Sequence, residues 1–235
     1  MAKTKPLISV IILAFNEEKF LPRCLNSLKN QSLKNFEIII VDNNSTDRTI
    51  KIAKSFGVKV VRENKQGITY ARERGYSEAQ SEIIARLDAD STAPKDWLNS
   101  LYLAIYPNPD SVAVTGNLVF PEVPPWIQIF LNLFTEIFYY GFTRLLTGHY
   151  PIVGTNYAIR KSAWEKISVH LDDKLFHEDM DLACHLNKIG KICFYREIKT
   201  VYSLRRWKRE FLKTLLNYSW RNVRTIWVHH PFFKR

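Results

Sequence analysis

Two carboxylates two residues apart, Asp88 and Asp90, directly follow a short apolar segment, residues 83–87. Alternate side chains of a strand point to one face, so a bend at the end of the strand can direct both carboxylates to one point. Hard oxygen ligands suit Mg²⁺ or Mn²⁺, and such ions commonly bind a substrate diphosphate as well. The alternative is a pair of solvated turn aspartates. The spacing therefore predicts a divalent-cation site if other polar groups gather nearby.

Three more acidic residues occupy positions where a carboxylate could act on a substrate. Asp42 follows the apolar segment 36–41, and there it could accept hydrogen bonds from a base N–H or a ribose hydroxyl. Aspartate is also common in turns after strands. Glu178 and Asp179 open a predicted helix, where the helix dipole alone favours acids. A carboxylate at that place could instead be a general base.

The elements that must position these residues alternate between apolar strands and amphipathic helices. The expected strands are residues 7–14, 36–41, 58–61 and 82–87. This alternation is typical of a parallel sheet covered on both faces, in which ligands bind at the carboxyl ends of the strands. Asn16, Asp42 and Asp88 each follow a strand, so we expect them at one edge of the sheet.

Composition and charge are consistent with one sizeable core and a basic tail. The chain has 235 residues, 46% of them hydrophobic, which allows one or two domains. Nine basic residues and one acidic residue lie between Leu204 and Arg235, so most of the net charge of +11 is in that segment.

The three cysteines have no ligand-like spacing and indicate a reducing compartment. The N-terminal residues imitate a short signal peptide but lack a small-residue cleavage site, so we expect a first strand instead.

Two segments are amphipathic in a way that favours contact with a membrane. Residues 126–146 are apolar except for Arg144 and one narrow polar stripe, formed by Gln128, Asn132, Thr135, Glu136 and Thr143. Their length approaches that of a membrane span, but Glu136 and Arg144 argue against spanning. We predict a helix in the membrane interface or along an apolar groove, with an ordinary core helix as the alternative. Residues 207–228 form a basic, Trp-containing helix of the kind that anionic bilayers attract. Docking of its apolar face on the domain is the alternative, and nucleic-acid binding is not expected because no such motif accompanies the charge.

Six sequence segments together resemble one known family. They are Ser9–Glu17, Val41–Asp47, Gly67–Gly75, Leu87–Asp90, Gly154–Lys161 and Glu178–Leu182. In this order they resemble the inverting family 2 glycosyltransferases with the GT-A fold, over roughly Leu7 to Tyr195. The resemblance implies an α/β fold: a Rossmann-like, mostly parallel sheet flanked by helices, with C-terminal amphipathic helices. It implies a glycosyltransferase domain at 1–200, with a nucleotide-binding half at 1–120 and an acceptor half at 121–200. Residues 201–235 would be a basic tail that associates with the membrane.

The resemblance also implies a role for each site residue. On the donor side, Asp42 would bind the nucleobase, and Glu17 and Arg72 would shape the nucleotide pocket. Asp88 would contact the ribose or the metal, and Asp90 would hold Mn²⁺ or Mg²⁺ on the diphosphate. Asn156 would lie on the acceptor-side loop near the donor sugar, and Asp179 would be the catalytic base with Glu178 beside it. The implied reaction is metal-dependent, inverting transfer from a UDP-sugar, or secondly a GDP-sugar, to a hydroxyl or phosphate acceptor. We expect that acceptor to be lipid-linked and the protein to be peripheral on the cytoplasmic face of the cell membrane.

One departure from the family pattern narrows the expected product. Processive synthases of the family carry Gln-x-x-Arg-Trp after the base, whereas this chain has Ser203 in place of the glutamine and keeps Arg206 and Trp207. We therefore predict transfer of a single sugar, with Arg206 as a candidate for a diphosphate contact. Two other functions compete: a non-catalytic nucleotide-sugar-binding membrane adaptor, and a sugar-phosphate nucleotidyltransferase. The second is disfavoured because no glycine-rich loop follows the first strand.

Overall fold

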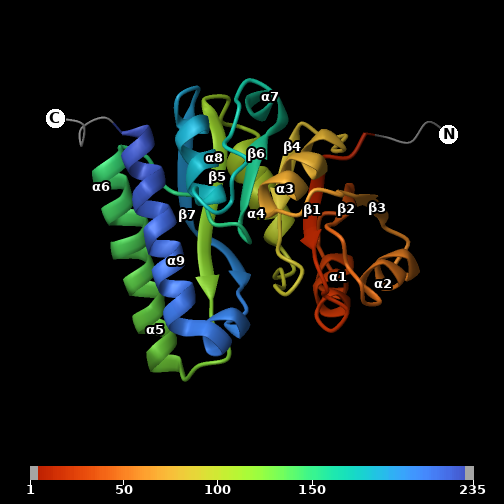
Figure 1. The fold of residues 1–235 in the computed structure, drawn as a ribbon. Helices are drawn as coiled ribbons and strands as arrows, with labels where there is room; N and C mark the ends of the chain where they lie inside the picture. The colour runs from red at the N-terminus through yellow and green to blue at the C-terminus, as the bar shows by residue number, and fades with distance from the viewer. Residues whose placement is uncertain (1–4, 231–235) are drawn as a thin grey trace.

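The computed structural model describes residues 5–230, apart from the side chains of Arg206 and Trp207. It contains one seven-stranded sheet with helices on both faces (Figure 1). The strands are β1 Ile8–Ala14, β2 Phe36–Asp42, β3 Lys59–Arg62, β4 Ile83–Arg86, β5 Ser111–Val119, β6 Tyr157–Arg160 and β7 Lys191–Val201. The helices are α1 Leu21–Lys29, α2 Thr49–Ser55, α3 Ile68–Ser77, α4 Trp97–Ile105, α5 Pro125–Phe134, the π-helix η1 Thr135–Phe142, α6 Thr143–Thr147, α7 Lys161–Trp164, α8 Glu178–Asn187 and α9 Arg205–His229.

The strand order β3-β2-β1-β4-β6-β5-β7 confirms the predicted mostly parallel α/β sheet. Strands β3, β2, β1 and β4 run parallel, with Ile8 opposite Phe36 in β2 and Ile83 in β4. Strand β6 is antiparallel to both of its neighbours, β4 and β5, while β7 returns parallel to β5. The carboxyl ends of β1, β2 and β4 therefore meet at one edge of the sheet.

Two apolar cores lie on the two faces of the sheet. Val10 of β1 packs with Leu25 of α1 and Leu101 of α4 on one face. Ile11, the next residue of the strand, belongs to the core that α3 and α8 cover on the other face, together with Leu182. Alternation along the strand explains the division, because successive side chains point to opposite faces.

The segment made of α5, η1 and α6 has its apolar face turned outward. No residue of α5 is buried, and the exposed side chains include Trp126, Ile129, Phe130, Phe138 and Leu145. The predicted polar stripe faces the domain instead: Thr143 is buried, and Glu136 bonds to Asn117 and forms an ion pair with Arg196. The core-helix alternative for residues 126–146 therefore does not hold.

Helix α9 shows the same inverted arrangement, with polar side chains toward the domain and apolar side chains exposed. Thr214, Arg221 and Thr225 are buried, whereas Leu216 and Trp220 are more than half exposed. The helix is kinked at Glu210, where the backbone leaves helical geometry. The alternative that this helix docks its apolar face on the domain is therefore wrong.

The two inverted segments lie beside each other along one side of the molecule (Figure 1). They are joined near both ends: Lys208 pairs with Glu122 at 2.5 Å, and the rings of His149 and His230 lie 5.6 Å apart. Over the described residues 5–230, none of the helices combines the length and the apolar character that crossing a bilayer requires.

Candidate active site

Hydrogen bonds tie together the loops that follow β1 and β2 at the carboxyl edge of the sheet. Asn16 has a left-handed backbone conformation, with φ of 57°, which asparagine tolerates better than most residues. Its side-chain oxygen accepts the N–H of Thr46 at 2.8 Å, and the N–H of Glu17 donates to the Thr49 hydroxyl at 2.8 Å. These contacts hold Glu17 at the edge where the site was expected.

Asp42 is fully buried at the end of β2 and is only partly satisfied. One carboxylate oxygen accepts the N–H of Ser45 at 3.2 Å. The other has no hydrogen-bond partner among the described residues. Because leaving a buried polar atom unpaired is costly, this oxygen suits a donor group of a ligand.

Glu17, Asp88 and Asp90 are the partly exposed carboxylates of this edge, and they already attract a cation of the chain itself. The guanidinium of Arg205 lies 2.6 Å from a Glu17 oxygen and 3.2 Å from an Asp90 oxygen. Burial and the charge of Asp88 raise the pKa of Asp90 to about 6, against the opposing effect of Arg205. Clustered oxygen ligands that stabilise a positive charge fit the expected Mn²⁺ or Mg²⁺.

Arg86 connects these carboxylates to Asp179, which lies in the first turn of α8. Its buried guanidinium donates to Asp179 Oδ1 at 3.0 Å and to Asp88 Oδ1 at 3.3 Å. The second Asp179 oxygen accepts the N–H of Gly154 at 2.8 Å. Glycine at 154 leaves room for this bond, since a Cβ there would lie 2.8 Å from that same oxygen and would have to displace it.

The electrostatics around Asp179 suit proton transfer. Burial raises the pKa of its carboxyl above the ordinary value, and the charge of Glu178 acts in the same direction, while Arg86 opposes both. Desolvation thus keeps the carboxylate basic, and the arginine keeps it oriented. A buried, oriented carboxylate with a raised pKa is a candidate general base.

Glu178 and Arg72 make buried polar contacts at the start of α8, and the roles predicted for them at the site stay predictions. The carboxylate of Glu178 pairs with Arg221 of α9 at 2.7 Å. Burial would raise its pKa, but the charges of His177, Arg221 and Arg86 lower it. Arg72 is fully buried and donates to the carbonyl oxygen of Glu178 at 2.7 Å.

Asn156 lies apart from the exposed carboxylates. It is fully buried, its amide donates to the carbonyls of Asn117 at 2.7 Å and Ile198 at 3.1 Å, and its oxygen accepts from the Trp97 indole at 2.8 Å. These bonds use both hydrogens of the amide inside the protein. The Asn156 side chain therefore helps to fix the loop that carries Gly154, and its place on the acceptor side near the donor sugar stays a prediction.

Arg86, Gly154, Arg205 and Arg221 were not singled out from the sequence for roles at the site. Arg86 had a usable signal, because a charged residue inside an otherwise apolar strand needs a buried partner. No sequence signal distinguished Arg205 and Arg221, since they belong to a run of basic residues that indicates only one charged tail. The side chains of Arg206 and Trp207, the matched part of the synthase motif, lie outside the described residues.

Comparison with known proteins agrees with this geometry. The model of "Glycosyl transferase family 2" matches residues 9–168. "Probable glycosyltransferase YdaM" of Bacillus subtilis (strain 168) is 30% identical over 207 residues, which cover 80% of this chain and 48% of YdaM. "Glucosyl-dolichyl phosphate glucuronosyltransferase" of Haloferax volcanii is 27% identical over 140 residues, 57% of this chain and 44% of that protein. The chain thus spans about half or less of the length of these curated relatives.

A solved structure shows the same fold. The mannosyltransferase PcManGT from Pyrobaculum calidifontis, determined with GDP-Man and Mn²⁺, superposes with a TM-score of 0.74 at 19% identity, over 94% of this chain and 63% of that one. The strand order and the carboxylates at one sheet edge define a protein of the GT-A type. The family match then identifies the chain: it belongs to glycosyltransferase family 2.

Proposed function

We propose that this protein transfers one sugar from a nucleotide-sugar donor to a hydroxyl or phosphate acceptor, with inversion at the transferred carbon. One observation supports this most strongly. Arg86 joins the buried carboxylate of Asp179 to Asp88 through bonds of 3.0 and 3.3 Å, so the proposed base and one donor-side carboxylate share one cation. An adaptor that only binds nucleotide-sugars has no use for a buried base held in this way.

On the donor side, the unpaired oxygen of Asp42 would accept a hydrogen bond from the nucleobase or ribose. UDP-sugars are the first expectation and GDP-sugars the second. Asp88 and Asp90 would hold Mn²⁺ or Mg²⁺, and the ion, when bound, would neutralise charge on the departing nucleoside diphosphate. Arg205, 3.2 Å from Asp90, supplies further positive charge at the same place.

On the acceptor side, Asp179 would take the proton of the attacking hydroxyl as the new bond to the sugar forms. The bond between the sugar carbon and the diphosphate oxygen breaks in the same step, and the diphosphate leaves with its electron pair. A phosphate acceptor would attack through an oxygen that is already ionised. A single in-line displacement inverts the carbon and needs no second carboxylate as a covalent nucleophile, unlike a retaining glycosidase.

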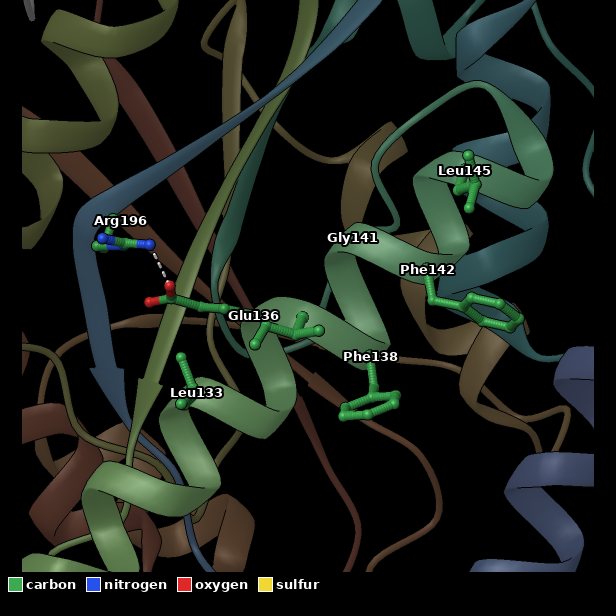
Figure 2. Close-up of a pocket in the computed structure, with 8 residues that line it drawn as sticks. Leu133, Glu136, Phe138, Gly141, Phe142, Leu145 and Arg196 are labelled. Carbon is green, nitrogen blue, oxygen red and sulfur yellow. Dashed lines mark ion pairs between the residues drawn. The ribbon is translucent and has the colours of Figure 1, made fainter.

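The inverted helices support a lipid-linked acceptor and a peripheral position on the cytoplasmic face of the membrane. An open groove of about 550 Å³ runs along η1. Figure 2 shows side chains that line it, among them Leu133, Phe138 and Phe142, with the Glu136–Arg196 pair at one side. Exposed apolar rows beside basic residues are what an anionic bilayer surface attracts. The name of the archaeal relative likewise specifies a lipid-linked sugar.

A transfer assay tests the proposal. Labelled UDP- and GDP-sugars are incubated with the protein, Mn²⁺ and an extract of bacterial membrane lipids, and the label is followed into the lipid phase. We expect one nucleotide pool to support transfer of a single sugar. Asp179→Asn should lower the rate by about 10²–10⁴-fold, the usual contribution of a general base, without loss of donor binding. Transfer that Asp179→Asn leaves unchanged would contradict the mechanism, and donor binding without any transfer would favour the adaptor.

A further inference from the structure

Five of the six histidines of the chain gather where α8 meets the end of α9. They are His149, His170, His185, His229 and His230. They come from four separate parts of the chain: the loop around His149, the loop around His170, the last turn of α8, and the end of the helical tail.

Four side chains of this region converge on one point. Oδ1 of Asp181 lies 2.7 Å from Nδ1 of His170, 2.7 Å from Nε2 of His229 and 3.7 Å from Nε2 of His185. All four candidate ligand atoms lie within 4.8 Å of one another. Asp181 is fully buried, and its other oxygen accepts the N–H of His170 at 2.8 Å, which fixes the carboxylate.

Hydrogen bonding within the cluster does not satisfy all of its members. Nε2 of His185 is buried and has no hydrogen-bond partner among the described residues. A buried ring nitrogen without a hydrogen-bond partner is a position at which a metal ion could bind. His185 follows Asp181 by one helical turn, so both side chains leave α8 on the same face.

We propose that His170, Asp181, His185 and His229 bind one Zn²⁺ ion. Three imidazole nitrogens and one carboxylate oxygen are a ligand set that Zn²⁺ accepts in tetrahedral geometry, and a set of four protein ligands is typical of a structural site. The site is separate from the donor-side carboxylates Asp88 and Asp90. It joins the last turn of α9 to α8, two residues beyond Asp179, and so supports the helix whose Arg221 pairs with Glu178.

A neighbouring group, His149, Cys184 and His230, offers three ligands only, with Sγ of Cys184 3.7 Å from Nε2 of His230. Because three ligands leave a coordination position open, we assign the structural ion to the four-residue set. The two assignments are separable, since they share no residue.

The test uses the purified full chain, stripped of metal with a chelator and titrated with Zn²⁺ at known concentration. We expect one Zn²⁺ per chain by elemental analysis, a higher unfolding temperature with Zn²⁺ than without it, and, with Co²⁺ instead, the strong visible absorption of a tetrahedral site. His185→Ala and His229→Ala should weaken Zn²⁺ binding by at least about 100-fold, since even loss of an outer-shell partner costs 10- to 100-fold. His170→Ala should do the same and, because His170 is partly exposed, is the variant least able to disturb folding.

Matched controls separate this site from the others. His177→Asn removes the one histidine outside both clusters and should keep the Zn²⁺, as should Asp90→Ala in the donor site. Cys184→Ser should also keep it. Zn²⁺ lost in Cys184→Ser but retained in His170→Ala would overturn the assignment, and so would a wild-type chain that binds no Zn²⁺ or gains no stability from it.

Discussion

Helix α1 and helix α9 use leucines in opposite ways. Leu21, Leu25 and Leu28 of α1 are completely buried against the sheet, whereas Leu212 and Leu216 of α9 are each more than two-thirds exposed. In the first half of the molecule apolar burial holds the helices. In the second half α8 still packs apolar residues against the sheet, whereas α9 is held by polar contacts such as the Arg221–Glu178 pair. The apolar side chains of α9 and of the segment from α5 to α6 therefore lie exposed on the surface of the described part of the chain.

The largest expected effect is on stability, and it contrasts the same substitution in the two regions. Leu25→Ala removes a side chain from a closed core and should destabilise the protein by about 2–5 kcal/mol. Leu216→Ala removes an equal volume from the surface and should stay within about 0.5 kcal/mol of the wild type. Denaturant unfolding of both variants measures the difference, and equal losses would show that α9 packs its leucines on the domain after all.

A smaller effect is expected where the second half depends on close polar contact. Gly154→Ala would place a methyl group 2.8 Å from Asp179 Oδ2 and 3.3 Å from Arg86. Relieving such a clash typically costs about 1–3 kcal/mol and should displace the carboxylate. We expect a reduced kcat with little change in nucleotide affinity. Gly141→Ala, whose new carbon would meet only the Glu136 carbonyl at 3.3 Å, is the control. An unchanged kcat in Gly154→Ala would mean that the position of Asp179 is not critical.

Membrane binding should depend on the exposed leucines of α9 and not on an exposed leucine elsewhere on the surface. Leu212→Ser with Leu216→Ser should reduce sedimentation with anionic liposomes by about tenfold or more, given about 1.5–3 kcal/mol for each fully buried leucine. Leu103→Ser changes a leucine that is 60% exposed on α4 and should have no effect. Added salt should weaken the wild-type interaction. Equal loss of liposome binding in all variants, or no binding by the wild type, would contradict the proposed membrane contact.

The smallest expected effect is a shift of the acid limb of the pH profile of kcat to higher pH. Because burial raises the pKa of Asp179, the carboxyl of the folded protein keeps its proton to a higher pH than an ordinary aspartate with pKa 3.8. As pH falls through that raised pKa the base becomes protonated and kcat should decline, about tenfold per pH unit. Measurement at saturating Mn²⁺ and donor keeps the titration of Asp90 out of the profile. An acid limb at or below pH 4 would contradict the assignment.

Sequence patterns predicted the fold well because apolar periodicity and strand-end positions are local properties. The strands β1, Ile8–Ala14, and β2, Phe36–Asp42, begin and end within a residue or two of the predicted strands. The antiparallel insertion of β6 depends on long-range pairing and was not foreseen. At the site, the carboxylates were predicted, whereas the arginines that connect them were not, since the partner of a charged side chain is fixed only by tertiary structure. The direction in which α9 faces was left open for the same reason.

The most direct test is calorimetric titration of UDP and GDP into the wild-type protein, Asp90→Ala and Asp179→Asn, each with and without Mn²⁺. It needs no knowledge of the acceptor. We predict Mn²⁺-dependent binding of one nucleotide to the wild type, loss of that binding in Asp90→Ala, and retention of it in Asp179→Asn. Absence of binding in the wild type, or equal binding in Asp90→Ala, would contradict the donor site.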